Sequence, residues 1–276
     1  MVTVTFIKIG YIGTTTLVEA LLDERSSRND LVMRVVSSGV KMDEDQSEEV
    51  SKYAAEIESD LYVVISPNAA LPGPTKAREV LKETGKPIIA ISDEPSRKKM
   101  KKLPEEGMGY LVLYGDPMIG AVTSFLDPVE MAIFNGDVLK VLSVTGVFRI
   151  VQRELDRVID EIKEGKKPTL PEIVVTKTRA IEASELTNPY AKAKAMAAFR
   201  MARQVASLTT EGVYKTDDRD ETILKVAAAH ELIREAAKLC DEARELEKAT
   251  DSVVRIAHFK AGNRRKKIEL HGKYEK

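Results

Sequence analysis

The first 115 or so residues repeat a pattern in which a short apolar run is followed by a loop of small residues and then by an amphipathic stretch. The apolar runs are Val2–Ile9, Leu31–Val36, Leu61–Ile65, Pro87–Ile91 and Tyr110–Leu113. Most are continuously apolar, which is typical of strands buried on both faces of a parallel sheet. The stretches between them with helical spacing include Thr15–Asp23, Ser47–Ile57 and Pro74–Thr84. This alternation predicts an α/β fold with a parallel, Rossmann-like sheet.

From about Met118 the pattern becomes helical. The predicted helices include Phe148–Lys163, the alanine-rich Pro189–Leu208 and the charged Asp220–Lys248, for which Asp217 or Asp218 is a candidate N-cap. Two alternating runs, Ser252–Phe259 and Lys266–Leu270, then flank a turn at Ala261–Asn263 and predict a hairpin. We therefore expect an α/β cofactor-binding domain at residues 1–120, a helical domain at 121–250 and a C-terminal β-hairpin at 251–276. A lone hairpin is marginally stable in water, so we expect it to pack on another subunit or on the helical region.

Composition narrows the classes of partner. The 43 basic and 44 acidic residues nearly cancel, so no global field favours nucleic acid or an anionic membrane, and an anionic ligand must be held locally. No run approaches the roughly 18 apolar residues of a membrane span, and charged Lys8 interrupts the N-terminal run. A single cysteine, Cys240, fits a reducing compartment. We expect a cytoplasmic protein that binds neither nucleic acid nor membrane.

The loops after the apolar runs are the places to look for chemistry, because ligands bind beyond the carboxyl ends of parallel strands. The first loop, Gly10–Thr16, reads GYIGTTT. Glycines allow close backbone approach, and the start of the next helix offers free N–H groups, which suits a phosphate or carboxylate. An ordinary strand-to-helix turn with a threonine cap explains the same residues equally well.

The third loop, from Ser66 to Pro74, is the most specific. Its three prolines and one glycine stiffen an extended backbone path. A stiff loop recognises a ligand at low ordering cost, although a proline-rich surface turn is the structural alternative.

Several familiar catalytic patterns are missing. The first loop is not a G-x-G-x-x-G fingerprint, and Ser37 stands where a ribose-binding acid would end the second strand, which counts against a nicotinamide site. The three histidines, His230, His258 and His271, have no metal-ligand spacing, so we expect no zinc site. Asp93 and Asp116 are the best-placed carboxylates, each either a general base or a loop residue that bonds its own backbone.

The loops resemble one family. The matching segments are Lys8–Thr14, Leu21–Arg25, Ser38–Met42, Ser66–Pro74, Gly115–Gly120 and Asn188–Tyr190. They are similar to the deazaflavin-dependent methylenetetrahydromethanopterin dehydrogenases of methanogenic and related archaea, and the similarity extends over essentially the whole chain.

The resemblance implies reversible hydride transfer between methylenetetrahydromethanopterin and coenzyme F420, which gives the methenyl pterin cation and the reduced coenzyme. Coenzyme F420 would be a dissociable co-substrate, with no metal and no tightly bound prosthetic group. The resemblance also implies a cytoplasmic homo-oligomer, a hexamer built as a trimer of dimers.

The site residues follow as hypotheses. The deazaflavin side is assigned to Gly10, Ile12, Gly13, Thr14, Ser37, Gly39, Pro67, Asn68, Asp116, Met118, Ile119 and Gly120. The pterin side is assigned to Arg149, Asn188 and Tyr190, although Arg149 serves equally well in a domain-bridging ion pair. No acid or base is required, with Asp116 as the candidate if one is used.

Three rival functions stay open at this point. A nicotinamide-linked dehydrogenase would use the same kind of sheet, and a non-catalytic sensor of phosphorylated metabolites would use the same loops. The basic run Arg264–Lys267 allows nucleic-acid binding, although a solvated hairpin edge explains it better.

Overall fold

A computed structural model describes residues 1–114 and 127–275, which form two compact units. Unit 1 consists of Met1–Leu113, Val151–Val174 and Ala257–Arg264, and unit 2 consists of Tyr114–Ile150, Val175–Ile256 and Arg265–Lys276. Each unit therefore draws on separate stretches of the chain, whereas the domains expected at 1–120, 121–250 and 251–276 are continuous.

Unit 1 is built on a parallel sheet, as the continuously apolar runs predicted. The strand order is β2 (Leu31–Ser37), β1 (Val2–Lys8), β3 (Leu61–Ser66), β4 (Ile88–Ser92), β5 (Gly109–Val112) and β6 (Glu172–Val174). Every residue of β3, β4 and β5 is buried, because helices cover both faces. The sequence analysis missed β6, which pairs with β5.

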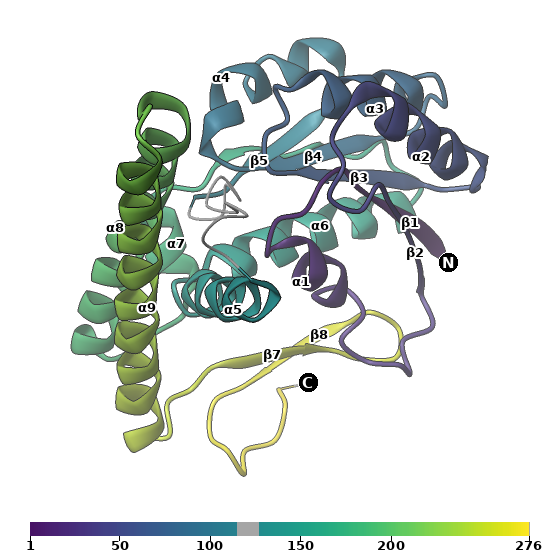
Figure 1. The fold of residues 1–276 in the computed structure, drawn as a ribbon. Coiled ribbons are helices and arrows are strands. Elements are labelled where there is room, and N and C mark those ends of the chain that lie inside the picture. The colour runs from purple at the N-terminus through teal and green to yellow at the C-terminus, as the bar shows by residue number, and fades with distance from the viewer. Residues whose placement is uncertain (115–126, 276) are drawn as a thin grey trace. The chain divides into compact units, whose positions relative to one another are not determined.

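The helices of unit 1 lie on both faces of its sheet (Figure 1). They are α1 (Thr15–Ala20), α2 (Glu44–Glu56), α3 (Pro72–Lys82), α4 (Arg97–Met100) and α6 (Val147–Lys163), whose first turn belongs to unit 2. Two short 3-10 helices, η1 (Glu94–Ser96) and η2 (Leu103–Glu106), flank α4. Figure 1 shows α2 and α3 on one face of the sheet and α1 and α6 on the other. A Gln152 side chain of α6 donates to the Leu21 carbonyl just after α1, at 3.2 Å.

Unit 2 is helical. Its helices are α5 (Pro128–Val144), α7 (Lys177–Ala183), α8 (Pro189–Lys215) and α9 (Arg219–Ala249). The long helices α8 and α9 pack along each other through fully buried alanines such as Ala195 and Ala236. Asp218 caps α9 by accepting a hydrogen bond from the Glu221 N–H at 2.8 Å. In the described part of the chain no single helix is long and apolar enough to span a membrane; the bent pair α5 and α6 meets that test by length and composition alone.

The C-terminal hairpin consists of β7 (Arg255–His258) and β8 (Arg264–Lys267). Its turn needs Gly262, whose φ of +80° is a conformation that side chains rarely adopt. The tip of the hairpin, Ala257–Arg264, belongs to unit 1, and the Asn29 N–H donates to the Lys260 carbonyl at 2.8 Å. The tip therefore packs on the sheet unit, which the sequence analysis did not expect, and packing of the hairpin on another subunit stays a prediction.

A continuous chain of alternating charges ties this tip to the sheet unit. It runs, in order, through Arg28, Asp30, Lys163, Asp160, Arg264, Asp156, His258 and Glu24. The N–O distances from Arg28 to His258 lie between 2.7 and 3.9 Å. Each interior group has an opposite charge on both sides, which offsets the cost of removing these charges from water.

His258 is a fully buried member of this chain of charges. Its imidazole is fully buried, with Nδ1 against the Glu24 carboxylate and Nε2 2.8 Å from Asp156 Oδ1. Both ring nitrogens must donate in this geometry, which requires the imidazolium form. Burial alone would lower the pKa of His258, but the hydrogen bonds to Asp156 and Glu24 outweigh it and raise the pKa above 6.5.

We predict that His258→Gln destabilises the protein most in mildly acidic solution. A raised folded-state pKa gives a stabilisation that is fully present below the unfolded pKa and lost as pH rises through the folded pKa. The loss should be about 3 kcal/mol near pH 6 and smaller near pH 9, because removing one partner leaves buried charges uncompensated. Denaturant unfolding across this pH range measures it, with the exposed His271→Gln as control. An equal loss at both pH values would show that His258 is neutral in the folded protein.

Candidate functional site

The carboxyl ends of three neighbouring strands meet at one edge of the sheet in unit 1. Lys8, the last residue of β1, pairs with Ser37 of β2 on one side and with Ile65 of β3 on the other. The loops that follow these strands therefore start side by side. They are the loops that the sequence analysis selected, so the structure brings the first three predicted segments together.

Gly10 lies where the three loops touch. Its N–H donates to Ser38 Oγ at 3.1 Å, and the same hydroxyl lies 2.6 Å from the Lys41 carbonyl, to which it donates. The φ of Gly10 is +74°, and a Cβ there would lie 2.5 Å from Met42 Sδ and 3.4 Å from Pro67 Cδ. A glycine is therefore required both by the backbone conformation and by the close approach of the neighbouring loops.

The third loop is held by side chains that the sequence analysis did not select. Ser92 Oγ, at the end of β4, donates to the Ser66 carbonyl at 2.8 Å and accepts from the Ala69 N–H at 3.0 Å. Within the loop, Asn68 Oδ1 accepts from the Ala70 N–H at 3.0 Å. Asn68 is half-buried, so part of its side chain faces outward from a fixed turn.

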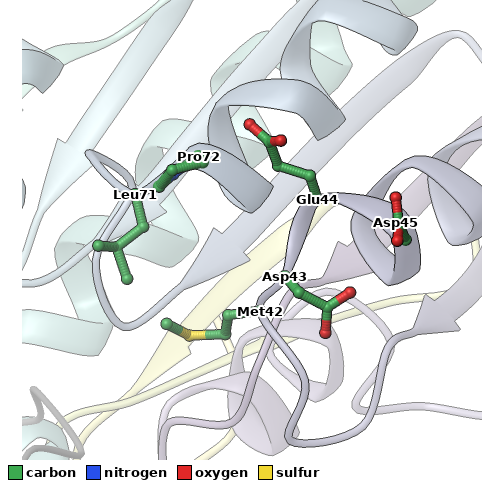
Figure 2. A pocket seen from close by; sticks show the side chains of 6 residues that line it. All are labelled: Met42, Asp43, Glu44, Asp45, Leu71 and Pro72. Atoms are coloured by element: carbon green, nitrogen blue, oxygen red, sulfur yellow. The ribbon is translucent and has the colours of Figure 1, made fainter.

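A pocket of about 550 Å³ opens beside these loops. Figure 2 shows Met42 on one side of it and Leu71 and Pro72 on the other. The remaining lining comes from Asp43, Glu44 and Asp45 at the start of α2. Met42 is thus shared between the pocket and the contact with Gly10.

The charges separate the loops from the pocket. The segments Gly10–Thr16, Ser37–Lys41 and Ser66–Leu71 contain no acidic residue, and Lys41 is an exposed cation among them. The pocket, in contrast, carries three consecutive acidic residues from Asp43 onward. An anionic group therefore fits over the uncharged loops, and the acidic side of the pocket suits it poorly.

The predicted deazaflavin residues differ in exposure. Those that are buried are Gly10, Ile12, Gly13, Thr14 and Pro67, and those that are exposed are Ser37 and Gly39. Only the second group is accessible to a ligand without a change in the loops. Four further predicted residues, Asp116, Met118, Ile119 and Gly120, lie outside the described residues.

The two threonines after Gly13 have different environments. Thr14 precedes α1 but makes no side-chain capping bond, so the cap of the simple turn interpretation is absent. Thr15 Oγ1 donates to the Ile12 carbonyl at 2.7 Å and so closes the turn itself. Asp93 is buried and accepts from the Glu94 N–H at 2.6 Å, as a loop residue bonding its own backbone would.

The residues assigned to the pterin lie in unit 2. Asn188 caps α8, with its Oδ1 accepting from the Tyr190 N–H at 2.8 Å. The buried Glu247 carboxylate accepts from the N–H groups of Thr187 and Asn188, at 2.6 and 2.7 Å, and so holds this turn. Tyr190 is 75% exposed and available for contact, and Arg149 is half-buried in the first turn of α6.

No group of three or more potential ligand side chains is arranged to hold a metal in the described ranges 1–114 and 127–275. The polar groups gathered at the loop edge are backbone amides, hydroxyls and carboxamides. Such groups bind and orient a ligand without supplying a strong acid or base.

Comparison with known proteins shows which family this chain belongs to. A model of the methylene-5,6,7,8-tetrahydromethanopterin dehydrogenase family matches residues 2–275. The chain belongs to this family. It is 49% identical over 276 residues to the F420-dependent methylenetetrahydromethanopterin dehydrogenase of Methanocaldococcus jannaschii, and 50% identical over 275 residues to that of Archaeoglobus fulgidus. Both alignments cover the whole of each chain.

A solved structure agrees with this assignment over the whole fold. It is an F420-dependent methylene-tetrahydromethanopterin dehydrogenase in complex with methylene-tetrahydromethanopterin and coenzyme F420. Its TM-score to this chain is 0.96 at 42% identity, with all of both chains covered. The resemblance drawn from the loop motifs is thereby confirmed, together with the α/β fold class.

We predict that Gly10→Ala costs more stability than Gly39→Ala. Both glycines have a positive φ, so each alanine should cost about 1 kcal/mol from backbone strain. At Gly39 the new Cβ meets open space, whereas at Gly10 it displaces Met42, which adds about 1–3 kcal/mol of overpacking. Urea unfolding of the two variants gives the comparison. Equal losses would mean that the contact between the first and second loops is loose.

Proposed function

We propose that this protein catalyses reversible hydride transfer between 5,10-methylenetetrahydromethanopterin and coenzyme F420. The family match over residues 2–275 carries the proposal. The loop edge of unit 1 supports it, because three loops without acidic residues meet there, with Lys41 as a cation, in a form suited to a planar ring with an anionic tail. The relatives in Methanocaldococcus jannaschii and Archaeoglobus fulgidus bear the name of this activity.

The proposed reaction needs alignment more than acid–base chemistry. The methylene carbon gives up a hydride and becomes the methenyl cation, and coenzyme F420 takes up the hydride and a proton to become reduced F420. Two partners that already carry the electronics require mainly a fixed distance and orientation. The residues of the loop edge fit this task, since they offer hydrogen bonds from a rigid backbone.

The assignments to individual ligands are part of the proposal. Ser37, Gly39 and Asn68 present accessible groups to the coenzyme over the buried residues Gly10, Ile12, Gly13, Thr14 and Pro67. Asn188, Tyr190 and Arg149 are proposed for the pterin, and Asp116 and Met118–Gly120 for further coenzyme contacts. An acidic residue that would hold a ribose is missing at Ser37, which speaks against the nicotinamide alternative.

We predict that Asn68→Asp weakens the binding of coenzyme F420 more than the binding of the pterin. The substitution keeps an oxygen for the Ala70 N–H but adds a negative charge where the anionic tail is proposed to lie. The KM for coenzyme F420 should rise about five- to tenfold and the increase should shrink with added salt, while the KM for the pterin changes less. Asn29→Asp is the matched control, because Asn29 precedes β2 and so lies at the opposite edge of the sheet.

The assay follows deazaflavin absorbance with purified protein and both substrates. Wild-type protein that reduces a nicotinamide but not coenzyme F420 would overturn the proposed function. Binding of phosphorylated metabolites without any turnover would favour the sensor. If Asn68→Asp and Asn29→Asp had the same effect on the coenzyme, the third loop would not be part of the site.

We further propose a cytoplasmic homo-oligomer, a hexamer built as a trimer of dimers. Val129 and Ile133 lie one turn apart on α5 and are 64% and 59% exposed. Two large apolar side chains on one helix face suit an interface between copies of the chain.

We predict that Ile133→Glu dissociates the assembly. A buried, unpaired carboxylate at an interface is costly, so the light-scattering mass should fall from that of six 30.6 kDa chains to a smaller species. Ile133→Leu keeps an apolar side chain and should retain the wild-type mass. An unchanged mass for Ile133→Glu would place the interface elsewhere.

A further inference from the structure

Arg78 is a buried cation with no assigned role in the proposed reaction. It lies in α3, and only 2% of the residue is exposed. Its guanidinium donates to the Pro74 carbonyl at 2.9 Å, to the Ala69 carbonyl at 3.0 Å and to Thr75 Oγ1 at 3.1 Å. Within the described part of the chain, these hydrogen bonds all go to uncharged oxygens.

Burying a guanidinium without a carboxylate partner costs free energy, because the charge loses its hydration. Burial lowers the pKa of Arg78 to about 10, against a weaker opposing effect of Glu106 and Glu79. The side chain therefore stays charged near neutral pH. An apolar side chain of similar length would fill the same space without this cost, so the reason for an arginine lies in the carbonyl groups that it holds.

The carbonyl groups belong to the third loop. Arg78 donates to the Ala69 carbonyl, and Ser92 Oγ accepts from the Ala69 N–H. Both backbone polar groups of Ala69 are therefore fixed by side chains from α3 and β4. Ala69 directly follows Pro67 and Asn68. The loop is thus held by hydrogen bonds at Ala69, directly after the two residues proposed to contact the coenzyme.

We propose that Arg78 is a positioning residue, which sets the conformation of the Pro67–Leu71 loop before the coenzyme binds. The inference rests on the proposed function, because it takes this loop as part of the coenzyme site. A loop that is already ordered loses little freedom on binding, so the benefit of Arg78 is expressed in coenzyme affinity. Arg78 itself does not touch the reacting atoms.

The experiment compares Arg78→Met and Arg78→Lys with Arg157→Met. Arg157 on α6 is the control: it also donates to a backbone carbonyl, that of Thr169 at 2.7 Å, but it is paired with Glu154 and Glu161 and lies outside the loop edge. Direct titration of coenzyme F420 gives the Kd, steady-state kinetics give kcat and both KM values, and amide hydrogen exchange of the ligand-free protein reports the order of residues 68–71.

We expect Arg78→Met to raise the Kd for coenzyme F420 about tenfold, with kcat and the pterin KM changed by about twofold or less. Exchange of the Ala69 and Leu71 amides should accelerate in the same variant. Arg78→Lys, which keeps the charge and one donor, should fall between Arg78→Met and wild type. Arg157→Met should leave the Kd and these amides unchanged.

Ser92→Ala keeps the inference testable if Arg78→Met does not fold. It removes the grip on the Ala69 N–H and should raise the same Kd and accelerate the same amides. A loss of thermal stability in soluble Arg78 variants with an unchanged Kd would overturn the positioning role, as would equal increases in both KM values. Failure of the proposed function is distinguishable, because the wild-type protein would then neither bind nor reduce coenzyme F420.

Discussion

Parallel pairing of β1 with β2 and β3 is the constraint on which the proposed site depends. It sends the carboxyl ends of all three strands to one edge, and the loops that follow must share that edge. The residues of β1 and β3 are almost all buried, whereas β2 is partly exposed and ends at the accessible Ser37. Stability and recognition are therefore separated in unit 1: the apolar strand residues hold the sheet together, and the loops carry the ligand-binding groups.

Loops that leave a parallel sheet lose the ladder that satisfies their backbone groups, and here side chains replace it. Ser38 bonds the Gly10 N–H, Ser92 bonds both Ser66 and Ala69, and Arg78 bonds the Ala69 carbonyl. Each of these side chains comes from a different loop, strand or helix than the group it holds. The loops are consequently fixed to one another as well as to their own strands. Loops fixed in this way can hold the ring of the proposed coenzyme in one orientation, which the proposed hydride transfer requires.

Sequence patterns predicted much of this and missed the rest for identifiable reasons. The five apolar runs correspond to β1 to β5. Burial explains the continuously apolar signal of β1, β3, β4 and β5, whereas β2 is partly exposed and contains Arg34. Strand β6 has three residues, none of them fully buried, which is too short for any periodicity to show. The glycines and prolines marked the loops, but Ser92 and Arg78 gave no local signal, because their partners are set by the packing of α3 and β4. The hairpin was predicted correctly, whereas the packing of its tip was not, since the pairing of His258 with Asp156 joins positions 102 residues apart.

The alternating charges at the hairpin tip contribute little at the loop edge, so the charges and hydrogen-bonding groups of the loops themselves matter most there. Four cations and four carboxylates nearly cancel along that chain, and Asp30 directly precedes β2, at the edge opposite the loops. A balanced, distant set of charges contributes little field at the edge where the coenzyme is proposed to bind. The whole chain is almost neutral as well. An anionic ligand is therefore attracted by what lies beside it: backbone N–H groups, hydroxyls, and Lys41 on one side with Asp43–Asp45 repelling it from the other. At the proposed site, discrimination would follow from the placement of uncharged donors, and this gives the proposed role of the buried Arg78 guanidinium, which is to fix the third loop, its physical reason.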